Sequence, residues 1–353
     1  PYTNMLRTTT EGMSAAIAGC DAITIHPFDH IFEQPEDFGR RIARNAQIIF
    51  SEEARLNQVF DPGAGSYYIE MLTDRIAGQS WKLFQEIEKQ GGMMAAVANR
   101  SITTMIASAA EERERAVAER KRIFVGTNQY PNAGERRGDA IDFDGRFQVT
   151  SLLESEKDLK FTVDRDRIVE SLAEALGKGA LFGDIVPELF DPGKQLFRPI
   201  QPGRATEKLE ELRLATERRG DPPSVFLVPM GDRKRRRARS TFAGNFLGCA
   251  GYEITDHIGF DSVDDAVDGI RKAAPDIVVL CSSDPEYKEL VKPFCSRMAS
   301  LDNEPLVLLA GYPDDEEEAD RYRKAGIDMF IHSRSNLPDR LKELHRKMGI
   351  LNR

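Results

Sequence analysis

Cysteine is scarce in this sequence, and no two cysteines are close enough to form a paired motif. The 353 residues contain four, at Cys20, Cys249, Cys281 and Cys295. Without a Cys-x-x-Cys pair, the sequence predicts neither a zinc site nor a disulfide framework. Isolated thiols are typical of proteins in a reducing compartment, so we expect a cytoplasmic protein.

Familiar catalytic and phosphate-binding motifs are absent as well. The sequence has no Ser-His-Asp or Cys-His arrangement, no P-loop and no dinucleotide-binding glycine motif. Residues 1–4 offer no initiator methionine, basic segment or apolar segment, so they do not form a signal peptide. We interpret them as the middle of a longer chain. A composition with 41% hydrophobic and 30% charged residues indicates a soluble globular protein without membrane spans.

The charge balance disfavours a general nucleic-acid-binding protein, because the formal net charge is -9 and the pI is about 5.3. One segment differs: Arg233–Arg239 contains six basic residues in seven. No aromatic residues, which stack on single-stranded bases, are interleaved with them. We therefore favour a solvated loop or a contact with an acidic partner over nucleic-acid binding.

The first 125 residues alternate between helical and strand-like patterns. Helices are predicted at 4–18, 38–50 and 72–87, with another ending near Lys121. The runs Asp21–His26 and Val59–Phe60 predict short strands. This alternation indicates a parallel sheet with crossover helices. A complete barrel needs roughly 250 residues, so we expect residues 1–125 to be the C-terminal part of a TIM (β/α)8 barrel, preceded by further chain.

The remaining residues divide into a linker region and a regular α/β domain. Residues 126–222 contain many prolines and glycines, with helices predicted at Asp164–Ala180 and Thr206–Arg218. In residues 223–353, five short apolar runs alternate with five helical patterns. The runs are Val225–Val228, Tyr252–Ile254, Ile277–Leu280, Leu306–Leu309 and Met329–Ile331. They predict a flavodoxin-like doubly wound domain with its ligand site at the carboxyl ends of the strands.

Four blocks of residues occur in a specific order near the start. They are Asn4-x-x-Arg7-Thr8-Thr9-x-Glu11, Asp37-Phe38-x-x-Arg41-Ile42-Ala43-Arg44-Asn45-x-Gln47, Asp61-Pro62-x-x-Gly65-Ser66-Tyr67-Tyr68, and Glu86-Ile87-Glu88-x-x-Gly91-Gly92-Met93. Their order and spacing resemble the methylmalonyl-CoA mutase family. The resemblance implies the last strands of that family's substrate barrel, followed by its cobalamin domain, and so covers nearly the whole chain.

In that family, adenosylcobalamin supplies a radical that interconverts succinyl-CoA and methylmalonyl-CoA. Glu11 and Gly12 match positions that touch the adenosyl group in the catalytic subunit, so the resemblance makes them cofactor-binding candidates or relics of that pocket. Arg7, Thr8 and Thr9 equally fit a hydrogen-bonded structural role. His26 would lie on the active-site side of a barrel, although a lone histidine is more often structural.

The family's cobalamin domain binds cobalt through an Asp-x-His-x-x-Gly loop after its first strand. The resemblance places Lys234, Arg236 and Arg239 at the Asp, His and Gly positions, and no histidine occurs between residues 30 and 257. Arginine stays protonated and offers no lone pair to a metal. We therefore expect no catalytic residue, no metal and no cobalamin on this chain, and we hypothesise that the basic run blocks the old cofactor-tail site.

Two further loops depart from the family pattern. Ser282-Ser283-Asp284 replaces a Ser-x-Leu element, and Ala310-Gly311 replaces Gly-Gly. Three altered cofactor loops are typical of the small, non-catalytic subunits of heterodimeric mutases. The sequences of three further segments also resemble those subunits: Phe197–Ile200, Arg204-Ala205 and Glu211–Arg213.

That resemblance implies a large catalytic partner subunit, which would bind adenosylcobalamin and the acyl-CoA in an isomerase complex of propionate metabolism. It implies no nucleic-acid or membrane partner. Two alternatives stay open. One is a stand-alone binding or regulatory module with a mutase-like fold, and the other is a subunit of a related acyl-CoA mutase, such as an isobutyryl-CoA mutase.

Overall fold

The chain forms two compact units, which are described one at a time. A computed structural model describes residues 2–30, 37–132, 134–135, 164, 166–181, 184–185, 203–301 and 303–351. One unit comprises Pro1–Thr104 with Ile141–Gln201, and the other comprises Met105–Ala140 with Pro202–Arg353. Among the described helices, none combines the length and the apolar character needed to cross a lipid bilayer.

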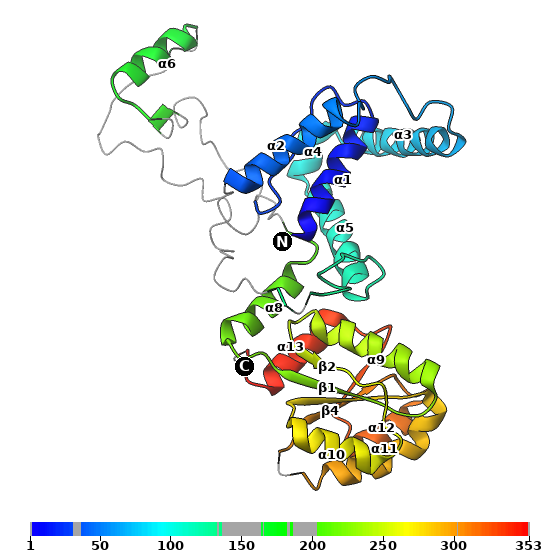
Figure 1. The fold of residues 1–353 in the computed structure, drawn as a ribbon. Helices are drawn as coiled ribbons and strands as arrows, with labels where there is room; N and C mark the ends of the chain where they lie inside the picture. The colour runs from blue at the N-terminus through cyan, green and yellow to red at the C-terminus, as the bar shows by residue number, and fades with distance from the viewer. Residues whose placement is uncertain are drawn as a thin grey trace. The chain divides into compact units, whose positions relative to one another are not determined.

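The first unit is helical in its described part, with the element order drawn in Figure 1. Its helices are α1 (Thr3–Ile17), α2 (Asp37–Glu52), α3 (Tyr67–Lys89), α4 (Gly92–Ala98) and α6 (Ile168–Gly177), and α5 (Ser101–Ala118) runs across the boundary between the units. The helices predicted at 4–18, 38–50 and 72–87 are confirmed. The predicted helix Asp164–Ala180 is confirmed over the shorter span of α6.

The two strands predicted in this unit are not formed. Residues 22–27 have no regular secondary structure, Val59 and Phe60 lie in a bend, and no strand occurs in the described part of this unit. A parallel strand needs a hydrogen-bonded neighbour on at least one side. Short β-rich runs such as Asp21–His26 therefore predict an extended backbone but cannot by themselves produce a sheet.

The second unit contains a five-stranded parallel sheet with the strand order β2-β1-β3-β4-β5. The strands are β1 (Ser224–Pro229), β2 (Glu253–Thr255), β3 (Ile277–Cys281), β4 (Leu306–Ala310) and β5 (Met329–Ile331). All five predicted strands are present. This order is that of flavodoxin-like doubly wound folds, so the predicted fold of the domain is confirmed.

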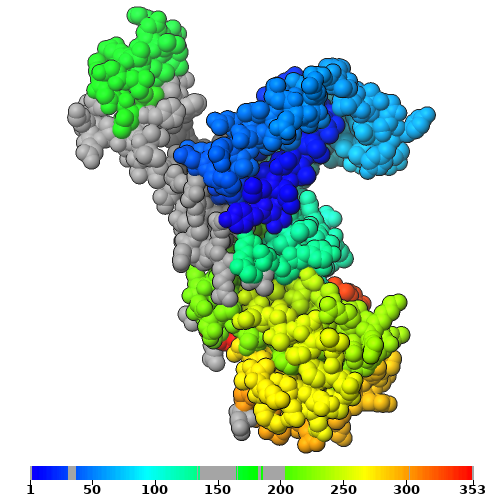
Figure 2. Space-filling model, in the orientation of Figure 1, coloured from blue at the N-terminus to red at the C-terminus, as the bar shows by residue number. Residues whose placement is uncertain are grey.

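Helices cover both faces of this sheet (Figure 1). They are α9 (Arg233–Gly248), α10 (Val263–Ala273), α11 (Asp284–Met298), α12 (Glu316–Ala325) and α13 (Leu337–Lys347). Side chains alternate along β1, so that Val225 and Leu227 pack with α9 and α13 while Phe226 and Val228 pack with α10, α11 and α12. In the space-filling view, this sheet and its helices belong to the part coloured from yellow-green to red (Figure 2). The sheet is thus buried on both faces, as parallel sheets require.

The second unit is larger than the predicted domain 223–353. Helix α8 (Glu207–Arg219), predicted at Thr206–Arg218, packs against α13 and places Leu209 and Leu212 in the same core as the sheet. Val117, at the end of α5, joins that core as well. Part of the segment predicted as a linker, 126–222, therefore belongs to the folded domain.

Candidate functional site

The site of interest lies where the strand order reverses. The chain leaves β1 toward β2 on one side, while β3 pairs with β1 on the other side. In doubly wound sheets, ligands bind in the crevice beyond the carboxyl ends of the strands at this switch point. Here that crevice is bordered by residues 230–232 after β1 and by Ser282 and Ser283 after β3.

A side chain of the protein itself occupies this position. The Glu286 carboxylate accepts hydrogen bonds from the Asp232 backbone N–H (2.9 Å) and from the Ser282 hydroxyl (2.8 Å). It also accepts hydrogen bonds from the hydroxyl (2.5 Å) and the backbone N–H (3.2 Å) of Ser283. The carboxylate therefore joins the loop after β1 to the loop after β3.

The surroundings of Glu286 stabilise its negative charge. Partial desolvation alone would raise the pKa of this carboxyl group, but the hydrogen bonds from Ser283, Ser282 and the backbone of Asp232 outweigh it and lower the pKa to about 2. Gly231 has a left-handed backbone (φ 79°), and a Cβ atom there would collide with the Glu286 carboxyl group. Glycine is therefore required at residue 231 both for the turn and for this close approach.

The basic run, Arg233–Arg239, forms about the first two turns of α9. Asp232 is its N-cap, and the Asp232 carboxylate accepts a hydrogen bond from the Arg235 backbone N–H at 3.0 Å. Within the described structure, no ion pair is formed by Arg233, Lys234 or Arg235, and all three are exposed. Positive side chains at a helix N-terminus oppose the helix dipole, so the N-cap carboxylate offsets an unfavourable charge arrangement.

The later residues of the run contact neighbouring segments instead, and Arg237 pairs with Asp256 after β2 at 2.6 Å. Arg236 donates a hydrogen bond to the Gly231 carbonyl (3.3 Å), and its guanidinium group lies against Gly259 in the loop after β2. Arg239 donates to both Asp284 oxygens, at 2.7 and 3.0 Å. A Cβ atom on Gly311 would lie 2.9 Å from Arg239 Nη1, so this guanidinium also reaches the loop after β4. That the run blocks the crevice stays a prediction, for which Arg236 and Arg239 are the relevant residues, and Glu286 was not part of it.

The candidate residues of the first unit lie on α1. Glu11 is exposed, and Gly12 is buried where α1 approaches α2. A Cβ atom on Gly12 would lie 2.6 Å from Ile25 Cδ1 and 2.9 Å from Phe50 Cε2, so close packing alone explains this glycine. The Thr8 and Thr9 hydroxyl groups donate to backbone carbonyls one helical turn earlier, which is the structural alternative. The ring of His26 stacks on that of His30 at 4.8 Å.

A buried cysteine and the two histidines that follow the edge strands have structural surroundings. Cys281 is fully buried, and burial raises the pKa of its thiol far above the usual range, so it behaves as a small apolar side chain. His257 and His332 follow β2 and β5, the two edge strands, and pack on aromatic rings. In the described ranges, no group of three or more His, Cys, Asp or Glu side chains could hold a metal ion.

Comparison with known proteins decides the family. Residues 1–191 match the family model described as methylmalonyl-CoA mutase. The chain belongs to the methylmalonyl-CoA mutase family. The four blocks of residues noted in the sequence lie inside this match, whereas the flavodoxin-like domain lies outside it.

Relatives extend the similarity over the whole chain. A methylmalonyl-CoA mutase small subunit of Porphyromonas gingivalis is 38% identical over 349 residues, which is 99% of this chain and 49% of that protein. A methylmalonyl-CoA mutase small subunit of Streptomyces virginiae is 31% identical over 333 residues, 93% of this chain and 46% of that protein. A methylmalonyl-CoA mutase of Rhizobium meliloti is 26% identical over 357 residues, 93% of this chain and 50% of that protein. The chain therefore spans about half the length of these relatives.

A solved cobalamin-binding protein from Desulfitobacterium hafniense DCB-2 aligns with 52% of this chain and 77% of its own, at 18% identity. Its TM-score of 0.28 marks a loose likeness. The flavodoxin-like order is instead visible in the sheet of this chain itself.

The crevice of this mutase-family chain does not fit a cobalamin held through a histidine. The family resemblance assigns Arg236 to the position of the cobalt ligand, and its guanidinium is directed to Gly231 and Gly259. Glu286 fills the space beside Gly231, and the Arg239–Asp284 pair joins α9 to the start of α11 beside Gly311. A cofactor tail would have to displace all three contacts.

Sequence reasoning missed Glu286, whose carboxylate is hydrogen-bonded to both loops. A signal was present, because Ser283-Asp284-Pro285-Glu286 is a Ser-x-x-Glu capping box at the start of a helix. The capping box predicts the contact of Glu286 with Ser283. It does not predict the contact with Asp232, which lies 54 residues earlier in the chain. The resembling segment Phe197–Ile200 lies outside the described residues.

Proposed function

We propose that this chain is part of the small, non-catalytic subunit of a heterodimeric adenosylcobalamin-dependent methylmalonyl-CoA mutase. In this proposal the large subunit binds adenosylcobalamin and the acyl-CoA and interconverts succinyl-CoA and methylmalonyl-CoA in the cytoplasm. The chain supports that partner and contributes no catalytic residue. The names of the two relatives with the highest identity quoted above favour this assignment.

The observation that carries the proposal is the replacement of the cofactor loop inside an intact domain. All five strands and five helices of the doubly wound fold are present. Within it, Arg236 cannot ligate cobalt, and Glu286 is bound by both loops that border the switch point. A domain that keeps its fold while its ligand crevice is filled is suited to a structural role beside an active partner.

The exposed apolar side chains of the first unit support the barrel part of the proposal. None of the side chains of α3 is buried, although many of them are large and apolar. Tyr67, Trp81 and Phe84 are 94%, 60% and 49% exposed. Large exposed apolar surfaces usually mark an interface. We propose that residues 1–125 are the C-terminal part of the family's TIM barrel and that the rest of a complete barrel covers this surface. Glu11 and Gly12 are then relics of the adenosyl pocket.

The test is to purify the full-length small subunit alone and together with a large mutase subunit from the same organism. Alone, it should show no mutase activity and no cobalamin absorbance after incubation with adenosylcobalamin. Together, the two chains should copurify in equal amounts, and activity should require the large subunit. Failure to copurify would favour a stand-alone regulatory module, and activity on isobutyryl-CoA in place of methylmalonyl-CoA would identify a related mutase.

A further inference from the structure

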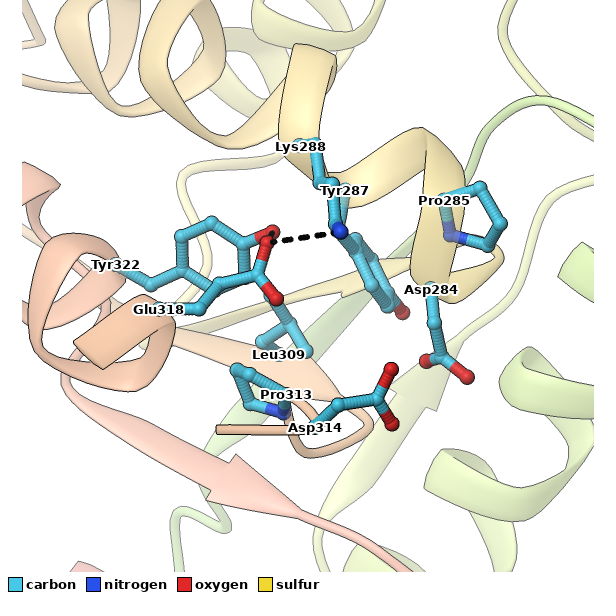
Figure 3. Close-up of a pocket in the computed structure, with 9 residues that line it drawn as sticks. All are labelled: Asp284, Pro285, Tyr287, Lys288, Leu309, Pro313, Asp314, Glu318 and Tyr322. Carbon is cyan, nitrogen blue, oxygen red and sulfur yellow. Dashed lines mark hydrogen bonds and ion pairs between the residues drawn. The ribbon is translucent and has the colours of Figure 1, made fainter. Parts of the chain in front are cut away.

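A second cavity lies one strand away from the switch point, between α11 and α12 (Figure 3). Its volume is about 160 Å³, and it opens at the carboxyl ends of β3 and β4. The lining residues are Asp284, Pro285, Tyr287, Lys288, Leu309, Pro313, Asp314, Glu318 and Tyr322. The family's cobalt-binding loop, at residues 230–239, does not contribute to it.

The chemistry of the lining changes from the base of the cavity to its rim. Leu309, Tyr287 and Tyr322 are almost fully buried and supply apolar and aromatic surface. Asp284, Asp314 and Glu318 supply carboxylates, and Figure 3 shows the Glu318 side chain beside the Tyr322 ring. Aromatic faces together with carboxylates are the surroundings that organic cations prefer.

Glu318 is the informative residue because its charge is buried. It is only 6% exposed, and its carboxylate accepts one hydrogen bond from the Tyr322 hydroxyl at 3.0 Å. The nearest cation is Lys288, whose Nζ lies 3.8 Å away and whose side chain is 63% exposed. A buried carboxylate is costly unless a cation donates hydrogen bonds to it. Glu318 is therefore paired with one exposed lysine through a long ion pair, and no shorter ion pair to it occurs among the described residues.

The other charged residues of the lining do not balance the negative charge of Glu318. Asp284 is already paired with Arg239, outside the cavity. Asp314 is exposed and has no partner among the described residues. Two carboxylates, Asp314 and Glu318, thus face a cavity in which Lys288 is the single cation of the lining.

We propose that this cavity binds a guanidinium or alkylammonium group whose charge lies at Glu318 and Asp314 and whose apolar stem packs on Leu309 and Tyr287. The size agrees, because an apolar protein cavity of about 150 Å³ accommodates one benzene-sized group. A nucleotide or a corrin ring is too large. The natural occupant is either an arginine or lysine side chain of a partner protein or a free small organic cation.

The experiment measures binding to the full-length chain by isothermal titration calorimetry and ligand-observed NMR. The probes are butylguanidinium, its uncharged isostere butylurea, and the capped peptide acetyl-Gly-Arg-Gly-amide. Butylguanidinium should bind saturably and butylurea should not. If the peptide binds at least as tightly as butylguanidinium, the occupant is a protein side chain. If only butylguanidinium binds, the occupant is a free cation.

Variants of the lining residues test whether butylguanidinium binds in this cavity. Glu318→Gln should weaken butylguanidinium binding about tenfold or more, because a charge-assisted hydrogen bond is lost. Lys288→Met should strengthen it several-fold by removing the competing cation. If Glu318→Gln does not fold, Asp314→Asn at an exposed position tests the same prediction. The matched control is Glu317→Gln, which lies on the same helix but outside the lining. Absence of saturable binding, equal binding of butylurea, or insensitivity to both carboxylate variants would overturn the proposal.

Discussion

The Glu286 carboxylate accepts the backbone N–H of Asp232 at 2.9 Å, and this contact links the two loops that border the switch point of the sheet. In a ligand-binding doubly wound domain, these loops point at the ligand. Here they point at a side chain of α11. The backbone N–H groups of Asp232 and Arg235 at the start of α9, and of Ser283 at the start of α11, are thus hydrogen-bonded within the chain.

We expect Glu286→Gln to destabilise the second unit by about 1–3 kcal/mol, since an amide NH2 would replace one acceptor oxygen among several donors. Hydrogen exchange of the β1 and β3 amides would measure the loss. Glu289→Gln, at an exposed position on the same helix, is the control and should change exchange by less than about 0.5 kcal/mol. Equal effects of the two variants would show that the hydrogen bonds of Glu286 contribute nothing to stability.

His345 should make the second unit sensitive to acid. It is fully buried, its Nε2 lies 3.0 Å from the Thr216 hydroxyl, and burial lowers its pKa from 6.5 to about 4. Between these values the unfolded chain binds more protons than the folded chain, so the free energy of unfolding falls as the pH falls from 6.5 to 4. The loss should reach about 3 kcal/mol.

Urea unfolding followed by far-UV circular dichroism at several pH values would test this pH dependence. His345→Gln removes the titrating group and should flatten the slope between pH 6.5 and 4. Arg346→Gln, at the exposed neighbouring position, should leave the slope as it is in the parent chain. An unchanged slope in His345→Gln would mean that other groups cause the acid sensitivity.

Restoring the family's loop should not restore cobalamin binding. The triple variant Lys234→Asp, Arg236→His, Arg239→Gly recreates the Asp-x-His-x-x-Gly pattern but leaves Glu286 between the loops and deprives Asp284 of its cation. We expect its absorption spectrum with added cobalamin to equal that of free cobalamin. A spectrum of histidine-ligated cobalamin would show that the loop sequence alone decides binding.

Gly12→Ala should destabilise the first unit by about 1–3 kcal/mol, because the new Cβ atom would collide with Ile25 and Phe50. Gly78→Ala is a matched control on α3, where nothing lies within 4 Å of the added Cβ atom. It should be neutral or stabilising by up to about 1 kcal/mol. Hydrogen exchange of the α1 and α2 amides would measure the change in stability of this unit. Equal destabilisation by both variants would contradict the packing role of Gly12.

Much of the second unit was predictable because its signals are local. Apolar runs long enough to be buried strands alternate with helical patterns, and this alternation is enough for a parallel doubly wound sheet. The inability of Arg236 to bind a metal was equally predictable, since a guanidinium cannot ligate a metal in any conformation. The Ser283 to Glu286 capping box also follows from residue spacing alone.

Tertiary structure decided the contacts between distant segments. Asp21–His26 has the composition of a strand, but a strand exists only beside a neighbour, and the described part of its unit provides none. Leu209 belongs to the sheet domain because α8 packs beside α13 and reaches the core. The linker-like composition of the segment around α8 does not predict this contact. Glu286 meets Asp232 only because β1 and β3 are adjacent in the sheet, and strand order is a property of the whole fold.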